Sequence, residues 1–409
     1  MNQYSQNSSS SWIIWFIPIF LFCLGIYSTP NGLAQSPDSS GYLLGGNSLL
    51  QGLGFKEVSP HFPPLYPMFL GLFGYFFNGD ILFGSRVLHG IVGAINGYLI
   101  IQIFKPFRIS NLLMALLVFV VATHYAHIFI NLWLWTEPLF LLLLLSNMVY
   151  LRGMILAGRY TVQSVFFLGF ISGLALLDRY AGIALVVSNI FVLLFCQSKQ
   201  GLSRKLVSSV LVGLVPVLML LIWVVHNLIF SGTATNRTVE IHFPSLEKIA
   251  GGLSVIGNWF IGTVLTRDSS KLLLAGSALI GLIIIIGCAV VAYRFTFMRH
   301  LDIEARLITG GLFGCFAVID LSFLITSISF FDAGTPLDRR ILSPVFICAA
   351  VVITYFIYDE KIKIIDRKWL TIFFLCLLLL SMPRSISWIE LNRSVGLEHG
   401  KTFNDQTKL

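Results

Sequence analysis

Apolar runs of about 18 residues or more recur along the whole chain, and each is long enough to cross the hydrocarbon core of a bilayer as an α-helix. Hydrophobic residues make up 56% of the 409 residues and charged residues only 11%. A soluble domain carries about 25% charged residues. Segments of about ten residues that alternate polar and apolar side chains, typical of membrane barrels, do not occur. The sequence therefore predicts an all-α, polytopic membrane protein.

The hydropathy pattern predicts about eleven spans in one integral membrane domain, 1–409. The predicted spans are 12–28, 82–104, 110–130, 138–156, 163–178, 180–197, 206–229, 272–293, 306–330, 341–358 and 369–383. Two connecting segments are long, 29–81 and 230–271, and loops of this length in a compact protein are usually functional. Segment 63–78 has three prolines near its start and is barely long enough to span. We expect it to be an amphipathic helix that lies on the membrane.

The distribution of basic residues predicts the orientation in the membrane. About half of the 27 Lys and Arg residues fall in short loops on one face, which the positive-inside rule assigns to the cytoplasm. The net charge of +8 therefore reflects topology and does not indicate nucleic-acid binding. Segments 29–81, 230–271 and the tail 384–409 then lie outside. The first span lacks the basic leader of a signal peptide, so we expect a retained helix in a multi-pass protein of the bacterial inner membrane.

Sequence motifs exclude several classes of function. All six cysteines lie within apolar segments and no CxxC pair occurs, so neither a disulfide framework nor a zinc site is indicated. The chain contains no P-loop, GxSxG or HExxH motif, which argues against ATP-driven transport, α/β-hydrolase chemistry and zincin chemistry. These patterns require no cofactor, and a divalent metal ion stays compatible with them.

Asp38 lies in segment 36–42, Ser-Pro-Asp-Ser-Ser-Gly-Tyr, just after the first span. A carboxylate at this level can act as a general base, or as a ligand for a metal or an acceptor, close to a substrate whose tail stays in lipid. The alternative is an ordinary helix cap, because Asp-Ser-Ser favours the start of a helix over 40–54. The proline-rich segment 61–67 follows in the same outer loop.

Two further outer positions place charge at predicted helix ends. Glu137 precedes Pro138, a natural first residue of a helix, and is either part of a helix cap or a second acid that faces the cavity of Asp38. Asp178 and Arg179 join two spans through a short turn. They form either a mutually neutralising pair or an arginine offered to a phosphate.

Charged residues near the ninth and tenth spans raise the same question. Asp338, Arg339 and Arg340 open the tenth span, and two adjacent arginines on the outer face indicate an anionic lipid or a lipid-linked substrate. Asp320 lies inside the ninth span, where a carboxylate is costly and is functional by default. Arg86 is its candidate partner, and a structural pair within the bundle is the alternative.

Polar residues elsewhere carry weaker signals. His226 and Asn227, at the end of the seventh span, can hydrogen-bond to a substrate, and 236–238 matches a glycosylation acceptor. His124 and His127 lie on one helix face, but two ligands do not make a metal site.

Six short motifs occur in one order over 36–344. They are Asp38-Ser39-x-x-Tyr42, Asn47-x-Leu49-Leu50-x-Gly52-x-Gly54-Phe55, Pro63-Pro64-Leu65-Tyr66-Pro67, Thr136-Glu137-Pro138-Leu139-Phe140, Gly173-Leu174-Ala175-x-Leu177-x-Arg179 and Asp338-Arg339-Arg340-x-Leu342-x-Pro344. The ordered set resembles the GT-C glycosyltransferases, specifically the family-39 group related to dolichyl-phosphate-mannose protein mannosyltransferases and aminoarabinose transferases. The resemblance implies a GT-C-like helical bundle with interfacial helices in the first outer loop.

The resemblance also implies an activity. Such an enzyme takes a sugar from a polyprenyl-phosphate carrier at the outer face and passes it, with inversion, to a lipid, glycan or protein acceptor. Asp38 would be the base and Glu137 a second catalytic acid, while positive charge stabilises the leaving phosphate. The expected phosphate ligands are Arg179, Arg339 and Arg340, and the expected substrate contacts are Tyr42, His61, Tyr66, His226 and Asn227.

The chain departs from this family pattern in three ways. Asp38 is followed by Ser39, where many relatives carry a second acid. His226 and Asn227 stand where relatives often show Arg-Asn, and the large soluble domain of oligosaccharyltransferases is missing. A secondary transporter or lipid flippase that uses Asp178 and Asp320 is the alternative function, and a non-catalytic member of the same fold is another.

Overall fold

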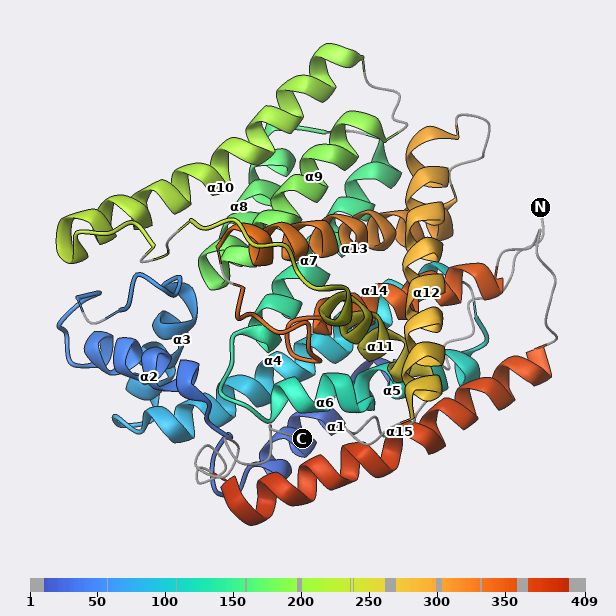
Figure 1. The fold of residues 1–409 in the computed structure, drawn as a ribbon, viewed down its shortest axis with the longest axis horizontal. Helices are drawn as coiled ribbons and strands as arrows, with labels where there is room; N and C mark the ends of the chain where they lie inside the picture. The colour runs from blue at the N-terminus through green and yellow to red at the C-terminus, as the bar shows by residue number, and fades with distance from the viewer. Residues whose placement is uncertain are drawn as a thin grey trace.

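The computed structural model describes residues 11–56, 58–107, 109–158, 160–196, 201–235, 237, 239–261, 270–298, 304–331, 333–358 and 367–396. These residues form helices and one isolated bridge between Ala34 and Trp133, which confirms the predicted all-α class (Figure 1). The helices are α1 Ser11–Ser28, α2 Pro37–Leu50, α3 Leu65–Phe76, α4 Ile81–Phe104, α5 Asn111–Thr123, α6 Tyr125–Asn131, α7 Glu137–Ala157, α8 Val162–Asp178, α9 Ile183–Phe195, α10 Leu202–Ser231, α11 Leu246–Ile261, α12 Lys271–Phe297, α13 Ala305–Phe330, α14 Ser343–Tyr358 and α15 Arg367–Val395, with 3₁₀ turns η2 Lys105–Phe107 and η3 Tyr180–Gly182.

Five of the described helices are long and apolar enough to cross a membrane. They are α4 continued by η2, α7, α10, α12 and α13. Helices α5 and α6 form a sixth candidate span that bends by 49°. The bend arises at His124, whose extended backbone ends α5 and whose side chain accepts a hydrogen bond from the N–H of Ala126 at the start of α6.

The other predicted spans coincide with helices that are too short to cross a membrane, or that are not both long enough and apolar enough to do so. The apolar parts of α1, α8, α9 and α14 have 10–17 residues, and the predicted span 369–383 lies within α15. At about 1.5 Å per residue, such helices are shorter than the ~30 Å hydrocarbon core. The described helices therefore support five or six spans by length and composition, and the number eleven stays a prediction.

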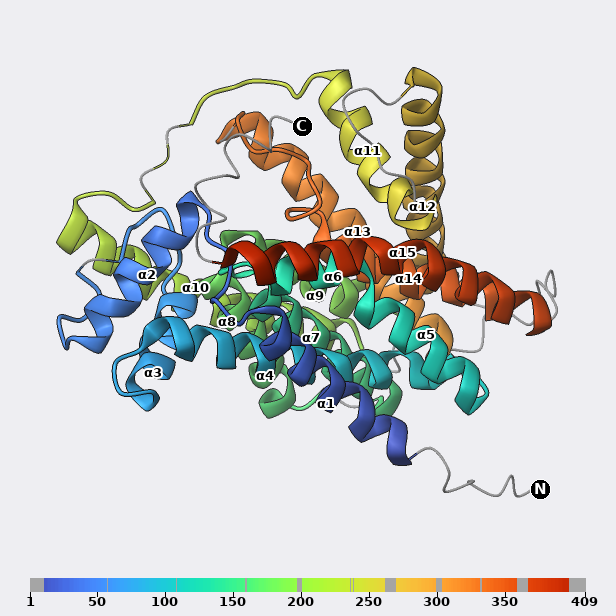
Figure 2. The same cartoon turned by 90° about the horizontal axis from the view of Figure 1, so that it is seen from below.

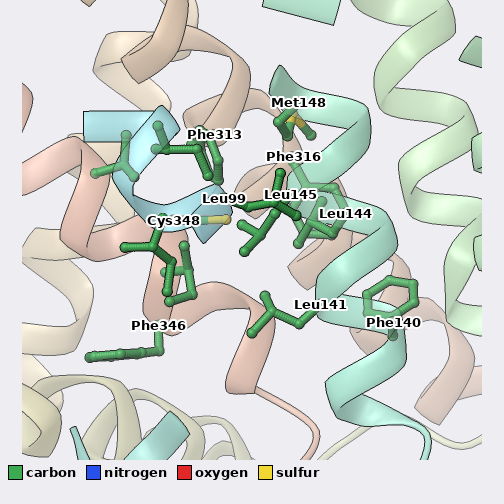
Figure 3. Packing of buried hydrophobic residues seen from close by; sticks show 14 of the residues in the cluster. Leu99, Phe140, Leu141, Leu144, Leu145, Met148, Phe313, Phe316, Phe346 and Cys348 are labelled. Carbon is green, nitrogen blue, oxygen red and sulfur yellow. The ribbon is translucent and has the colours of Figure 1, made fainter. Parts of the chain in front are cut away.

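The centre of the bundle is formed by α7 against α4, α8 and α13. Figure 3 shows Leu141, Leu144 and Leu145 of α7 turned toward Phe313 and Phe316 of α13 in this buried cluster. A helix that is apolar on all sides is stable only when other helices or lipid surround it. This core fixes the start of α7 and the last turns of α13, and both border the cavity that Asp38 and Arg340 line.

Helices α2 and α3 form the first outer segment and pack on each other and on α4. The predicted helix over 40–54 begins and ends earlier, at Pro37 and Leu50. It ends there because Gly52 and Gly54 have φ of 74° and 69°, a left-handed conformation that glycine adopts without a steric penalty. Segment 63–78 contains α3, whose 12 residues are too short to span, at about 18 Å.

The close approach of η3 to α8 gives a test of the packing that positions Arg179. A Cβ atom built on Gly182 would lie 2.5 Å from the carbonyl carbon and oxygen of Ala175. We expect Gly182→Ala to lower the free energy of unfolding by about 1–3 kcal/mol, because this overpacking pushes η3 away from α8. Thermal unfolding of the variant and the wild type in detergent micelles measures this loss of stability.

Gly153→Ala in α7 is the matched control, since no neighbouring atom would lie within 4 Å of its Cβ. It should be neutral or stabilising, because alanine favours a helix interior by about 1 kcal/mol over glycine. Equal unfolding temperatures for the two variants would contradict the proposed contact.

Candidate functional site

The segment that carries Asp38 is fixed to the segment that precedes α7. The N–H of Ala34 donates to the carbonyl of Leu132, and the N–H of Leu134 donates back to the carbonyl of Ala34, each at 2.9 Å. The buried Ser39 hydroxyl donates to the carbonyl of Leu134 at 2.9 Å. Residues that are distant in sequence are therefore held side by side at the start of α7.

The start of α2 rests on the same contact. Ser36 is the N-cap, its N–H donates to the Ser39 hydroxyl at 2.9 Å, and its own hydroxyl accepts from Trp135 Nε1 at 2.8 Å. The alternative that Asp38 is the helix cap is therefore wrong, because Ser36 holds that position and Asp38 follows Pro37 within the first turn. A carboxylate there is favoured by the positive end of the helix dipole. Its side chain is free of capping and 37% exposed.

Arg340 joins Asp38 to Glu137. Its Nη1 donates to Asp38 Oδ2 at 2.6 Å and its Nε donates to Glu137 Oε1 at 2.6 Å. The guanidinium also lies 4.4 Å from the ring centroid of Trp135. Burial alone would lower the pKa of Arg340, but the two carboxylates raise it, so the guanidinium stays charged.

The loop that carries Arg340 is shaped by Asp338. One carboxylate oxygen of Asp338 accepts from the N–H groups of Arg340 and Ile341, at 2.9 and 3.0 Å. This is the turn that an aspartate makes with the backbone two residues on. Asp338 therefore positions the Arg340 backbone, while the Arg340 side chain enters the site.

Glu137 is the first residue of α7, and its side chain is only 1% exposed. It accepts from Arg340 and also forms an ion pair with Arg179, the residue that follows α8. A buried carboxylate is very costly unless it is paired and hydrogen-bonded. Asp38 and Glu137 thus balance Arg179 and Arg340 in one cluster of four charges.

A cavity of about 350 Å³ opens beside this cluster. This volume lies within the range of small-molecule sites, about 300–1,000 Å³. The predicted residues among its lining are Asp38, Tyr42, His61, Arg179 and Arg340. Burial raises the pKa of Tyr42, so its hydroxyl stays neutral and can donate a hydrogen bond to a bound molecule.

Arg237 also lines the cavity, and the sequence analysis did not identify it. It follows α10 in the second long outer loop, and its guanidinium lies 5.7 Å from the ring centroid of Tyr180. No acid among the described residues pairs with it. In the sequence, Arg237 is the middle residue of the possible glycosylation acceptor 236–238. Asn236 and Thr238 of that motif lie outside the described residues. Its position in a long outer loop was the available signal.

Two predicted residues lie close to the site without lining the cavity. Tyr66 is buried, contacts Tyr42 edge-to-face at 5.2 Å, and its hydroxyl shares a 2.7 Å hydrogen bond with His89 Nε2. Arg339 lies against Tyr125, with the guanidinium 5.9 Å from the ring centroid. Adjacent arginines in one loop thus reach different neighbours.

His226 and Asn227 are not among the residues that line this cavity. The His226 ring stacks on Trp223 at 5.1 Å and contacts Phe55 at 5.8 Å. Asn227 donates to the carbonyl of Ala234 at 3.0 Å. Both residues therefore organise the end of α10 and the loop after it.

The two other acids that the sequence analysis singled out as functional candidates within the bundle, Asp178 and Asp320, are buried and take no part in the ion pairs of the charge cluster. Asp178 lines the cavity wall, but neither of its carboxylate oxygens has a hydrogen-bond partner among the described residues. Arg179 pairs with Glu137 instead. Arg86 is not the partner of Asp320, because it donates to the hydroxyl of Thr29 and to the carbonyl of Ile26.

The described part of the chain offers no ready-made ligand group for a resident metal ion. Among the described residues no three His, Cys, Asp or Glu side chains are grouped so that they could hold one. Asp38 and Glu137 each accept from an arginine.

Comparison with known proteins shows the fold. No family model matches the sequence, and no curated protein is detectably similar to it. The structure is similar to that of the Archaeoglobus fulgidus oligosaccharyltransferase, which was crystallised tethered through a disulfide bond to an acceptor peptide containing the NVT sequon. The TM-score is 0.52 at 11% identity, over 95% of this chain. The match covers 56% of that enzyme, so this chain spans just over half its length.

This likeness confirms the predicted GT-C-like helical bundle and the assignment to multi-pass membrane proteins. At 11% identity, this likeness shows only that the two proteins share a fold. The resemblance to the family-39 group stays a prediction from the sequence motifs.

The charge cluster makes a prediction about stability. Glu137→Gln leaves Arg179 and Arg340 without their shared carboxylate, and breaking a buried pair costs about 3–5 kcal/mol. We expect a fall of that size in the free energy of unfolding, measured by thermal or denaturant unfolding in micelles.

Glu304→Gln is the matched control, because Glu304 pairs with Arg306 but its side chain is 54% exposed. A pair at that exposure contributes about 0–1 kcal/mol. If the two variants lost similar stability, Glu137 would not be the centre of the cluster.

Proposed function

We propose that this chain is a glycosyltransferase of the family-39 type, which moves a sugar from a polyprenyl-phosphate donor to an acceptor hydroxyl, with inversion. The observation that carries the proposal is one cavity, about 350 Å³, lined by a half-exposed carboxylate, Asp38, and by Arg179, Arg237 and Arg340. The carboxylate supplies a base, and the guanidinium groups favour a developing phosphate anion.

Asp38 is the proposed general base. Arg340 holds its Oδ2, and no described residue donates to the other carboxylate oxygen. That oxygen takes the proton of the acceptor hydroxyl as the hydroxyl oxygen attacks the anomeric carbon. A new C–O glycosidic bond forms, and the bond from that carbon to the phosphate oxygen breaks, with its electron pair leaving on the polyprenyl phosphate. The configuration inverts because nucleophile and leaving group lie on opposite faces of the sugar.

Arg237 is the best candidate for the principal ligand of the leaving phosphate. The positive charges of Arg179 and Arg340 are already balanced by Glu137 and Asp38, whereas Arg237 has no described acid partner. A guanidinium binds phosphate oxygens through two parallel hydrogen bonds. The Arg237 guanidinium lies over the ring of Tyr180. The Tyr180 hydroxyl is itself held in place, because it donates to the carbonyl of Pro60 at 2.9 Å.

The proposal includes the partners and the location. The donor is a polyprenyl-phosphate-linked sugar, with membrane lipids around it, and the site faces the outer side of a bacterial inner membrane. The acceptor is a lipid, glycan or protein. The peptide bound by the archaeal oligosaccharyltransferase makes a protein acceptor worth including in any assay. No nucleic acid takes part.

Asp38→Asn tests the assignment of the base. Removing a general base typically costs a factor of about 10²–10⁴ in rate. We expect a loss of transfer in that range, with the variant still folded in the membrane. The assay uses purified membranes and a panel of polyprenyl-phosphate sugars with lipid, glycan and protein acceptors. Full transfer by the variant would refute the role of Asp38.

Arg237→Gln tests the phosphate ligand. Loss of one donor to a developing oxyanion costs a factor of about 10²–10³ in kcat, and we expect a decrease of that order. Arg339→Gln is the comparison, since Arg339 lies against Tyr125 and should leave kcat within a few-fold of the wild type. A large loss of kcat in Arg339→Gln, with little change in Arg237→Gln, would instead identify Arg339 as the phosphate ligand.

A transporter or lipid flippase is the second candidate function. The observation in its favour is that Asp178 and Asp320 are both buried, and a carboxylate inside a membrane protein often serves a proton or ion pathway. Uptake or flipping that is lost in Asp320→Asn but kept in Asp38→Asn would favour this function. If neither transfer nor transport is found, the chain is a non-catalytic member of the fold.

A further inference from the structure

The ring of Phe62 lines the cavity and is held in place by three neighbours. Its centroid lies 4.7 Å from that of Tyr42 and 4.9 Å from that of His61. A Cβ atom built on Gly41 would lie 2.8 Å from Phe62 Cε2, so the ring rests on the backbone of α2 at this glycine. The Phe62 side chain is only half-buried, so part of the ring stays accessible in the cavity wall.

The loop that carries Phe62 is itself fixed. The N–H of Phe62 donates to the carbonyl of Ser59 at 3.0 Å, and the carbonyl of Pro60 accepts from the Tyr180 hydroxyl at 2.9 Å. Pro63 follows, and its ring restricts the backbone of both residues. Figure 2 shows α2 and α3, on either side of this loop, packed together at one end of the molecule beside the last turns of α10. The ring is therefore in position before a ligand binds, and a ligand that lies on it loses little binding free energy to ordering it.

Phe62 is a neighbour of Asp38, although the two residues belong to different segments. Asp38, Gly41 and Tyr42 are spaced i, i+3 and i+4 in α2, so they share one face of the helix. Phe62 contacts that face at Gly41 and Tyr42. One helical turn rises about 5.4 Å, which places the ring and the carboxylate about one turn apart. Both line the same cavity.

The chemistry of the cavity decides which part of the donor this ring can hold. The guanidinium groups of Arg179, Arg237 and Arg340 suit a phosphate, which gains nothing from an apolar ring. A sugar ring carries C–H groups on its faces and hydroxyls at its edge. The face of an aromatic ring is negative and attracts such weakly positive C–H groups. In the proposed reaction the sugar also has to lie next to the acceptor hydroxyl that Asp38 deprotonates.

We propose that Phe62 is the residue on which the sugar of the donor lies, and that it selects a carrier bearing a cyclic sugar over the bare polyprenyl phosphate. The inference rests on the proposed transfer reaction and adds a sugar-binding residue to it. Gly41 belongs to the same subsite, because only a residue without a side chain lets the ring lie against α2 beside Asp38. The lipid chain and the phosphate are common to both carriers, so the difference between the two affinities reports the sugar contact alone.

Binding of the two carriers to the full chain in uncharged detergent tests the role of Phe62. The probes are a short polyprenyl phosphate and the same carrier bearing mannose, glucose or arabinose, and the sugar that binds tightest is used. Phe62→Leu keeps an apolar side chain but removes the ring. An aromatic contact of this kind corresponds to about a two- to tenfold change in affinity. We expect Phe62→Leu to reduce the preference for the sugar-bearing carrier by about that factor, with the affinity for the bare carrier unchanged.

Three further variants sharpen this test. Phe62→Tyr keeps the ring and should keep the preference. Gly41→Ala should lower the preference as Phe62→Leu does, because its Cβ displaces the ring while Phe62 itself remains. Phe55→Leu is the matched control and should keep the preference. Phe55 lies in the same connection between α2 and α3 but packs on Trp223 and His226, at 6.0 and 5.8 Å, and is not among the residues that line this cavity. Unfolding in detergent alone shows that each variant is folded.

Two results would overturn the role of Phe62. The first is a preference that falls no further in Phe62→Leu than in Phe55→Leu. The second is an equal loss of affinity for both carriers in Phe62→Leu, which would place the lipid chain or the phosphate on the ring. A wild-type protein that binds no sugar-bearing carrier more tightly than the bare carrier would contradict the proposed transfer itself, and the sugar contact with it. The two kinds of failure are thereby told apart.

Discussion

The paired charges around Arg340 are the interaction on which the cavity end of the bundle depends. Arg340 reaches Asp38 across 302 positions of sequence and Glu137 across 203, so one guanidinium joins α2, α7 and the loop before α14. Glu137 is buried at the end of a membrane helix, where an isolated carboxylate would be strongly unfavourable. Two arginines make that burial tolerable. The same arrangement leaves Asp38 half-exposed and oriented toward the cavity.

This cluster forms because the backbone brings the segments together first. The bridge between Ala34 and Trp133 and the hydroxyls of Ser36 and Ser39 fasten the start of α2 to the start of α7. Packing between membrane helices has little hydrophobic driving force, so such polar contacts and close backbone approaches specify which helix ends meet. Local capping chemistry thus sets the position of a residue whose proposed role is catalytic.

Several features were predictable because they depend on local sequence. The predicted spans coincide with helices, since long apolar runs have no other stable form in lipid. The identity of the cap of α2 was not predicted, because Asp38 and Ser36 are both good capping residues and the contact of Ser36 with Trp135 decided between them. The predicted pairing of Asp320 with Arg86 was wrong, because Arg86 donates instead to Thr29 and Ile26, at the end of α1 and just after it.

By itself the sequence determined the all-helical class, the membrane environment, the position of Asp38 just after the first apolar helix, and the resemblance to GT-C transferases. These follow from composition, periodicity and the order of short motifs. Only the tertiary structure decided that Arg340 enters the site while Arg339 turns to Tyr125, and that Arg237 joins the cavity from a distant loop. The reason is physical: side-chain direction at adjacent positions, and contacts between segments far apart in sequence, depend on how the helices pack.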